Sequence, residues 1–301
     1  VSAMSILRLI PYPPGVIEGG EILFKGEDLL EVSEERIREV RGDRISMIFQ
    51  EPSTSLNPVL SIQRQLTETL ELHRGMKSKE AKAESVRLLD VVGIPDAERR
   101  VKDYPHQFSG GMQQRIMIAI ALSCNPDAII ADEPTTALDV TVQAQILELI
   151  AELREHSGMS VLLITHDLDV VRKTAERVYV MQAGNIIEDG DTASVFRAPT
   201  QAYTQQLIAA EPQPRSRSIP ENAPVVLQGK KIQVWFPIKK GVLRKTVDYI
   251  KATDDVNLSI RAGETVGVVG ESGSGKTSLA LALLRLISSR GEIELLGRPL
   301  Q

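Results

Sequence analysis

Apolar positions along the first 211 residues follow two alternating patterns. Helical spacing is found in residues 1–10, in 34–40 after a capping Ser33, in 62–92 with a break near Gly75, and from the glycines at 110 and 111 to about Leu122. Short apolar runs typical of buried strands are 45–50, 128–131, 161–165 and 178–181. Helices separate the last three runs, so we expect a parallel sheet with crossover helices. Residues 184–190, GNIIEDG, are typical of a hairpin arm.

The pattern changes after residue 211. Residues 212–224 are rich in proline, serine and charge, which predicts a linker. A strand-rich segment then leads through TVGVVG, expected to be a strand, into TSLALALLRLI, expected to be a helix. Residues 278–287 match residues 1–10 in spacing, and GEIELLG at 291–297 matches GEILFKG at 20–26. We therefore expect 1–211 to be one unit without its first phosphate loop, and 225–301 to be the start of a similar unit.

The composition excludes or disfavours several classes of protein but does not identify one. The net charge of −5 gives no electrostatic reason to expect nucleic-acid binding. No aliphatic run approaches the roughly 20 residues that a membrane-spanning helix needs, so a membrane role is expected to run through partners. Cys124 is the one cysteine, which excludes an internal disulfide and Cys-rich metal modules, and favours a reducing, cytoplasmic setting. The start of the chain has no signal-peptide pattern.

The strongest chemical signal is GESGSGKT at residues 270–277. A strand before it and a helix after it are the context that a phosphate-binding loop requires. Backbone N–H groups made accessible by the glycines, together with the helix N-terminus, would surround phosphate oxygens. Lys276 would reach the β- and γ-phosphates, and Thr277 would offer its hydroxyl to Mg²⁺. The alternative is a glycine-rich turn, which this context disfavours.

Four further signals are weaker when each is taken alone. IIADEP places Asp132 and Glu133 at the carboxyl end of a strand, suited to Mg²⁺ and to polarising a water; a helix cap is the commoner meaning of such a pair. FSGGMQQR would present Ser109, Gly110 and Gly111 at a helix start, as an anion site or as a simple N-cap. His166 follows a strand, where a lone histidine is usually structural. Gln50 alone would mean almost nothing.

Together, in this order and spacing, these motifs resemble the ATP-binding cassette (ABC) family over essentially the whole chain. FQEPSTSLNP at 49–58 and FRAPTQAYTQQLIAAEP at 196–212 resemble its peptide and nickel importer branch. FPIKKGVLRK at 236–245 and the two-unit layout resemble the fused tandem ATPase of microcin C and oligopeptide importers. The resemblance implies an α/β P-loop NTPase fold with a RecA-like parallel core, an antiparallel β subdomain and a helical signature subdomain.

The resemblance also implies a role for each matching residue. Gly270, Glu271, Ser272, Gly273, Ser274, Gly275 and Lys276 would bind the phosphates of ATP, and Thr277, Gln50 and Asp132 would bind or support Mg²⁺. Phe236 would stack on adenine, with Trp235 as the alternative. Glu133 would be the general base, and His166 would contact the γ-phosphate. Ser109, Gly110 and Gly111 would close over ATP held by the opposite unit, and Asp139 would also belong to the nucleotide-binding residues. Met112 stands where glutamine is commoner, which removes one amide contact.

The implied function is an ATPase that energises a bacterial peptide importer from the cytoplasmic face of the inner membrane. Its implied partners are two permease subunits, a periplasmic solute-binding protein acting indirectly, and a second ABC unit paired head to tail. Lys276 would then face Ser109, while Glu133 and His166 would lack their own phosphate loop. Alternatively, 225–301 completes 1–211 as one circularly permuted domain. Two other interpretations are an ABC protein acting on ribosomes or DNA, which the short linker disfavours, and a chain that binds nucleotide without hydrolysing it.

Overall fold

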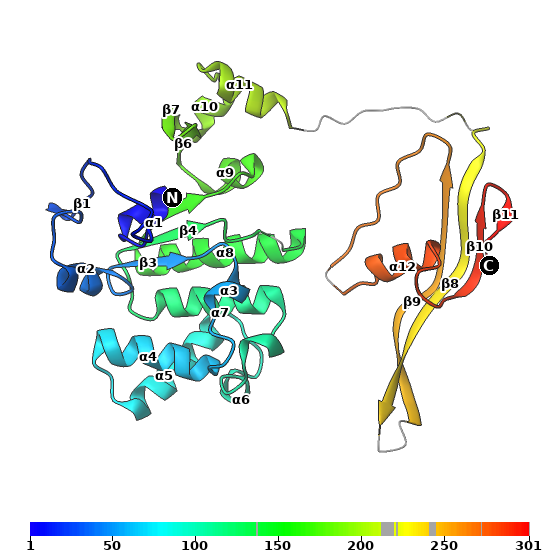
Figure 1. The fold of residues 1–301 in the computed structure, drawn as a ribbon, viewed down its shortest axis with the longest axis horizontal. Coiled ribbons are helices and arrows are strands. Elements are labelled where there is room, and N and C mark those ends of the chain that lie inside the picture. Colours follow the sequence, from blue (N-terminus) through cyan, green and yellow to red (C-terminus); the bar gives the residue numbers. More distant parts are fainter. Residues whose placement is uncertain (137, 212–219, 221, 241–244, 272, 301) are drawn as a thin grey trace. The chain divides into compact units, whose positions relative to one another are not determined.

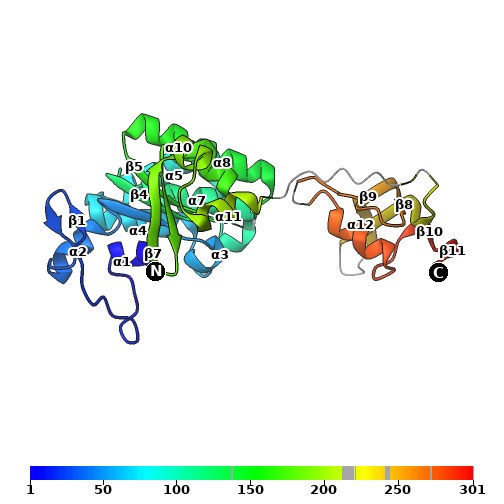
Figure 2. The same ribbon diagram turned by 90° about the horizontal axis from the view of Figure 1, so that it is seen from above.

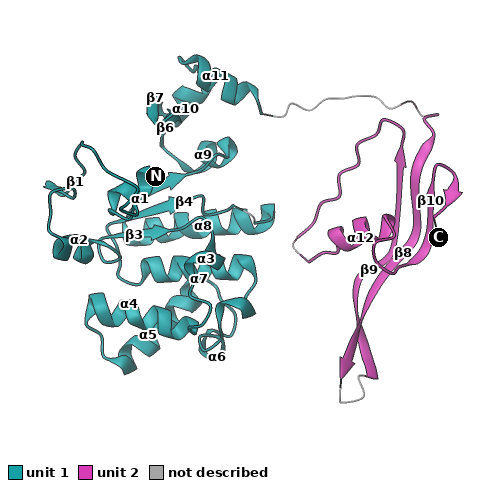
Figure 3. Cartoon of the chain, in the orientation of Figure 1, with its two compact units in different colours: residues 1–211 teal, residues 212–301 magenta. Residues whose placement is uncertain are grey.

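Three parallel strands form the centre of the first part of the chain. The computed structural model describes residues 1–136, 138–211, 220, 222–240, 245–271 and 273–300. The described chain separates into unit 1, residues 1–211, and unit 2, residues 212–301 (Figure 3). In unit 1 the sheet order is β3-β4-β5, from Ile45–Ile48, Ala128–Asp132 and Ser160–Ile164. The predicted parallel sheet is therefore confirmed for these strands.

Helices and loops bury both faces of this sheet, as Figures 1 and 2 show. Ile129 and Ala131 belong to a large cluster with the helical part of the unit, whereas the intervening Ile130 packs with Ile45 and the N-terminal segments. Alternate residues of one strand thus enter two separate cores. This explains why the strand is apolar at nearly every position, as expected for a parallel sheet covered on both faces.

The helices predicted for unit 1 are present, with shorter ends in places, and α3, α6, α10 and α11 are present without having been predicted. In chain order the described helices are α1 Ser2–Ile6, α2 Glu34–Val40, α3 Pro52–Ser55, α4 Ile62–Arg74, α5 Ser78–Val91, α6 Ala97–Arg100, α7 Gly110–Leu122, α8 Val140–Ser157, α9 Leu168–Thr174, α10 Thr192–Arg197 and α11 Ala202–Ala209. Ser33 caps α2, and its hydroxyl accepts a hydrogen bond from Arg36 N. Gly75 ends α4 in the left-handed conformation, which accounts for the predicted break.

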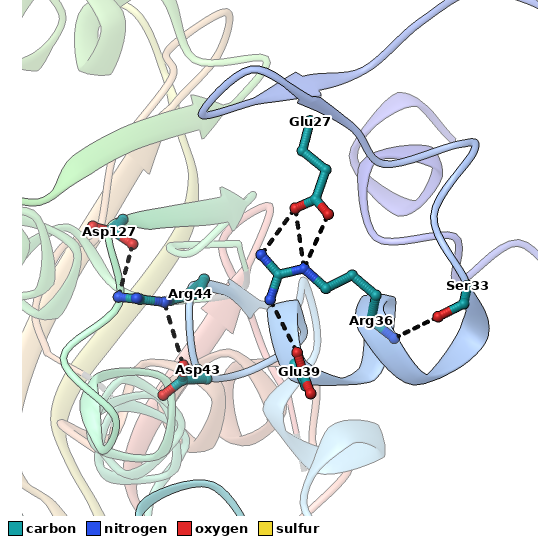
Figure 4. A network of polar contacts seen from close by, with 7 residues as sticks. All are labelled: Glu27, Ser33, Arg36, Glu39, Asp43, Arg44 and Asp127. Carbon is teal, nitrogen blue, oxygen red and sulfur yellow. Dashed lines mark hydrogen bonds and ion pairs between the residues drawn. The ribbon is translucent and has the colours of Figure 1, made fainter.

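A salt bridge joins α2 to the small hairpin of β1 (Leu23–Phe24) and β2 (Glu27–Asp28). Figure 4 shows Arg36 reaching Glu27 and Glu39 with its guanidinium group, at 2.9 and 3.0 Å. The Arg36 side chain is the largest cause that holds the pKa of Glu27 below its ordinary value. The hairpin is thereby fastened to the helix that packs under the central sheet.

One predicted strand of unit 1 is present but lies outside the parallel sheet. β6, Arg177–Gln182, pairs antiparallel with β7, Asn185–Asp191. The two residues between them, Ala183 and Gly184, have φ of 48° and 83°. Positive φ at both positions is the requirement of the tightest two-residue hairpin turn, so local pairing places β6 beside β7. The predicted hairpin arm is confirmed, and the prediction that 178–181 joins the parallel sheet is wrong for the described pairings.

Unit 2 is built on an antiparallel sheet of order β11-β10-β8-β9. Its elements are β8 Val225–Lys240, β9 Lys245–Arg261, α12 Lys276–Leu283, β10 Arg290–Leu295 and β11 Arg298–Pro299. The core packs α12 against the inner halves of β8 and β10, through Ile232, Val234, Leu279, Leu283 and Ile293. The expected linker, 212–224, falls largely outside the described residues.

The expected strand TVGVVG is not a strand in the structure. Residues 264–270 have no regular secondary structure and no paired strand, and Val268 and Val269 are 48% and 92% exposed. A buried strand needs neighbours for its backbone hydrogen bonds, and no described strand of unit 2 lies beside this segment. The helix after the phosphate loop also ends early, at Leu283, and leaves Leu284 and Leu286 exposed.

The repeat seen in the sequence is also present in the backbone. The hairpin pairs Leu23 with Asp28 in unit 1 and Glu294 with Pro299 at the matching place in unit 2. Left-handed residues coincide as well: φ is 105° and 104° at Gly20 and Gly291, 51° and 52° at Lys25 and Leu296, and 49° and 56° at Arg8 and Arg285. Non-glycine residues rarely adopt this conformation, so its recurrence at matched positions confirms the repeat independently of residue identity.

Candidate nucleotide site

Two groups of candidate residues lie in different units, and the first group gathers at one edge of the central sheet. β3, β4 and β5 are parallel, with Ile48 beside Ala131 and Asp132 beside Ile164. The chain therefore leaves all three strands at the same edge. Gln50, Glu133 and His166 follow these strand ends, at the place where open α/β sheets bind ligands.

Glu133 is the centre of this edge. Its Oε2 accepts hydrogen bonds from Gln50 Nε2 at 2.8 Å and from Thr136 Oγ1 at 2.7 Å. Its Oε1 lies 3.0 Å from His166 Nδ1, which donates because a carboxylate can only accept. The structure thus brings together three residues predicted from separate motifs.

These contacts determine the charge of the carboxylate. The hydroxyl of Thr136 is the largest cause that lowers the pKa of Glu133, followed by the hydrogen bond from His166. A lowered pKa keeps Glu133 ionised at neutral pH, as a group that polarises water must be. The His166 side chain is 76% exposed, against 23% for Glu133, so the imidazole is the accessible member of the pair.

The backbone at Glu133 is unusual. Its φ is 48°, in the left-handed region that a glutamate rarely enters. Its N–H donates to the carbonyl of Ile164 at 2.8 Å, so the turn out of β4 is tied to the end of β5. Strained residues of this kind persist where the surroundings fix them, and they are enriched at functional sites.

Asp132 is the last residue of β4 and is half-buried. Its carboxylate makes no hydrogen bond or ion pair with the residues that the structure describes, so its oxygens are open to a ligand. Within the same described set, no group of three His, Cys, Asp or Glu side chains could hold a metal ion. Mg²⁺ usually takes one or two carboxylates plus phosphate oxygens and water, so the residues fit an ion that arrives with a nucleotide.

The SGG segment forms the start of α7. Ser109 is the N-cap, and its hydroxyl accepts from Met112 N at 3.4 Å. A Cβ added to Gly111 would lie 2.6 Å from Val142 Cγ1, so close packing of α7 on α8 also requires this glycine. Met112 packs against the large core of unit 1, and its sulfur accepts from Arg100. The segment is thus a capped helix start whose first N–H groups have no acceptor within the helix.

Asp139 is placed as the N-cap of α8, where its carboxylate accepts from Val142 N at 3.0 Å. Ala137, two residues before Asp139, lies outside the described residues. The structure gives Asp139 a structural task, and the predicted part in nucleotide binding stays a prediction.

The phosphate-loop sequence in unit 2 is curled around its own lysine. Lys276 Nζ donates to the carbonyls of Gly270 and Glu271, both at 2.7 Å, and lies 3.3 Å from Ser274 Oγ. A Cβ on Gly275, whose φ is 91°, would lie 1.9 Å from the carbonyl oxygen of Ala252. Glycine is therefore required where the loop turns into α12. Gly273 and the exposed Thr277 are described, whereas Ser272 lies outside the described residues.

The two aromatic candidates on β8 differ in how free their rings are. Lys251 and Arg290 lie over the Trp235 ring at 4.5 and 5.5 Å, and its Nε1 donates to Asp254. Phe236 is 44% exposed and lies opposite Ile250. Phe236 is the ring that remains open to a stacking partner.

Thr136 is the one residue of the Glu133 cluster that we did not predict from the sequence. It follows Glu133 by three positions within EPTTALD, and its hydroxyl reaches back because the chain turns at the left-handed Glu133. The sequence signal that could have indicated this contact is a hydroxyl residue three positions after the carboxylate at the strand end.

Comparison with known proteins identifies the class. The sequence model described as "ABC transporter" matches residues 4–136 and 253–301, which is more than half of the chain. The chain therefore belongs to the ABC transporter family, and the α/β P-loop NTPase fold predicted for it is confirmed. A solved structure, "Dimeric structure of a post-hydrolysis state of the ATP-binding cassette MJ0796 bound to ADP and Pi", is 30% identical, with a TM-score of 0.53 over 58% of this chain and 74% of that one.

Individual relatives narrow the branch. The "Peptidoglycan transport ATP-binding protein YejF" of Agrobacterium fabrum is 54% identical over all of this chain and 55% of its own length. The "Glutathione import ATP-binding protein GsiA" of Salmonella paratyphi A is 43% identical over 97% of this chain and 52% of its own length. The chain thus spans about half the length of these curated relatives. Among the described residues, no helix is long and apolar enough to cross a membrane.

Proposed function

We propose that this chain is part of an ATP-binding and ATP-hydrolysing subunit that energises a bacterial importer of peptides, of the microcin C or oligopeptide type. The observation that carries the proposal is the convergence of Gln50 and His166 on the ionised Glu133 at the carboxyl edge of the parallel sheet. The named tasks of the relatives, peptidoglycan transport and glutathione import, support a solute with peptide bonds.

In this proposal Glu133 orients and polarises the water that attacks the γ-phosphate, and His166 contacts that phosphate. Asp132, Gln50 and Thr277 support Mg²⁺, which supplies charge neutralisation when it is bound. Lys276, with Gly270, Glu271, Ser272, Gly273, Ser274 and Gly275, holds the triphosphate, and Phe236 stacks on adenine. Ser109, Gly110 and Gly111 act on ATP held by a second, head-to-tail unit, and Asp139 contributes to nucleotide binding.

The partners are proposed on the same basis. Two permease subunits would convert closure and opening of paired ATPase units into transport, with a periplasmic solute-binding protein acting indirectly. The subunit would lie at the cytoplasmic face of the inner membrane as a peripheral protein.

We also propose that residues 225–301 can complete unit 1 as a circularly permuted domain. β5 has one paired neighbour, β4, and its Leu162 is 43% exposed. Residues 265–269 are a mainly apolar, unpaired segment of similar length. A fourth strand of this kind, added beside β5, would satisfy the backbone groups of both segments.

Substitution of Glu133 by glutamine tests the catalytic assignment. In the longer two-unit protein, Glu133→Gln should keep ATP affinity and lower phosphate release by about 100-fold or more, because the amide cannot accept a proton. Lys276→Ala should instead weaken ATP binding itself. Undiminished phosphate release by Glu133→Gln would contradict the assignment. The same two assays on the 301-residue chain separate hydrolysis from binding without turnover.

A further inference from the structure

The outer half of the β8–β9 hairpin extends past the core of its own unit. We call residues 237–240 and 245–250 the arm. The core of unit 2 stops at Val234 on β8, and Figure 1 shows both strands continuing well beyond α12. Every residue from 245 to 250 is exposed. Nothing in the described part of unit 2 covers the arm.

The arm carries positive charge that its own unit does not neutralise. Lys239, Lys240 and Lys245 are exposed, against the single acid Asp248, in a chain whose net charge is −5. None of the three lysines forms an ion pair with a described residue. Moreover, Lys240 lies directly opposite Lys245 in the antiparallel ladder. Like charges at directly opposed positions destabilise a hairpin, so an anionic partner from outside would relieve this repulsion.

Exposed aliphatic side chains accompany these lysines. Val247 and Ile250 are 55% and 60% exposed. A register shift between Ile238 and Lys239 inserts Val247 as an extra residue next to the lysine pair. A nucleic-acid backbone would use the lysines but not the aliphatic groups. The surface of an anionic bilayer uses both, because headgroup phosphates meet the ammonium groups and the interfacial region accepts the apolar side chains.

We propose that the arm binds the surface of an anionic lipid bilayer. This contact goes beyond the proposed function, in which membrane association depends on permease subunits. Each basic side chain close to an anionic bilayer strengthens binding by about fivefold, and the effect falls within a Debye length. Three lysines therefore give an attachment that is weak, reversible and dependent on salt. It adds to the contact with permeases and orients unit 2.

The test is co-sedimentation of the 301-residue chain with lipid vesicles. We expect binding to vesicles of phosphatidylcholine with phosphatidylglycerol, little binding to phosphatidylcholine alone, and loss of binding at high salt. The double variant Lys240→Glu/Lys245→Glu should bind the anionic vesicles at least tenfold more weakly. Its matched control is Lys79→Glu/Lys82→Glu on α5, which changes the net charge equally at two exposed lysines without ion pairs to described residues, and should bind like the unmodified chain.

Further variants separate this proposal from loss of folding and from other ligands. Lys240→Glu alone places opposite charges across the ladder, so the hairpin should remain folded by circular dichroism while vesicle binding falls. Ile250→Ser should also weaken binding, since the aliphatic part of the contact is lost. Equal binding to neutral and anionic vesicles, unchanged binding by the double variant, or binding to single-stranded RNA but not to vesicles would each overturn the proposal.

Discussion

At the scale of single residues, Gly111 has two reasons to be a glycine. Its place in the SGG segment suggests nucleotide contact, and Val142 leaves no room for a Cβ. The sequence shows the first reason alone, because only the packing of α7 on α8 shows the second. An inactive variant at this position would therefore not by itself demonstrate a nucleotide contact.

Gly111→Ala should destabilise the protein. The added methyl would lie 2.6 Å from Val142 Cγ1, and overpacking of this kind lowers the free energy of unfolding by about 1–3 kcal/mol. Gly110→Ala is the matched control, since its nearest contact is 3.9 Å away at Leu138 and alanine favours the helix. Urea denaturation of both variants measures the difference. Equal unfolding free energies of the two variants would contradict the prediction and show that α8 moves to accommodate the extra methyl group.

The residues of the candidate site could be predicted from the sequence where they belong to a recognisable motif. Gln50, Glu133 and His166 were predicted, and the structure brings them together. Thr136 was missed because its contact depends on the left-handed backbone of Glu133, which no residue pattern announces. Helix caps were predicted only in part. Ser33 was predicted as the N-cap of α2, whereas Asp139 was assigned to nucleotide binding and its role as the N-cap of α8 was missed.

At the scale of elements, Glu188 ties β7 to the segment before α11. Its carboxylate accepts from Thr200 N at 2.7 Å, from Thr200 Oγ1 at 2.9 Å and from Gln201 N at 3.2 Å. The hydroxyl of Thr204, followed by Thr200 N, lowers the pKa of Glu188 to about 2. The charged form is thus the one that the fold stabilises.

The stability of this region should therefore depend on acid pH. A depressed pKa means that the contribution is present above the ordinary pKa of glutamate, and is lost as pH falls toward about 2. Hydrogen exchange of residues 198–205 should rise between neutral pH and about pH 3, after correction for intrinsic rates, more than in Glu188→Gln. The same pH response in variant and unmodified chain would remove Glu188 as the cause.

Element predictions succeeded where local patterns suffice and failed where pairing depends on distant chain. Capped or glycine-terminated helices such as α2 and α4 were predicted well. β6 was placed in the wrong sheet, since a tight turn with two left-handed residues pairs it with β7. Residues 265–270 have the apolar pattern of a buried strand but do not form one. Such a pattern shows that a segment favours burial beside other strands, but it does not show whether those strands are available.

At the scale of the whole molecule, the unpaired segment 265–269 and the β5 edge give the permuted-domain proposal a direct test. Val268→Asp places a charge in the proposed strand, where burial of an unpaired carboxylate is unfavourable. Hydrogen exchange of Leu162–Ile164 should then become faster. Val247→Asp is the control, because it makes the same change at an exposed valine of the arm. Unchanged exchange in β5 after Val268→Asp would mean that β5 does not pair with this segment.

The equal left-handed residues in the two hairpins have a consequence for which of the two stretches can replace the other. Glycines and non-glycines alike keep the same unusual torsions at matched positions, although the side chains between them differ. The two hairpins thus share a backbone shape that their side chains alone do not dictate. It follows that residues 20–28 should fit in place of 291–299, so a chimera that carries them there should fold. The reverse exchange should not be tolerated, because it would put an arginine beside Arg36 in place of Glu27.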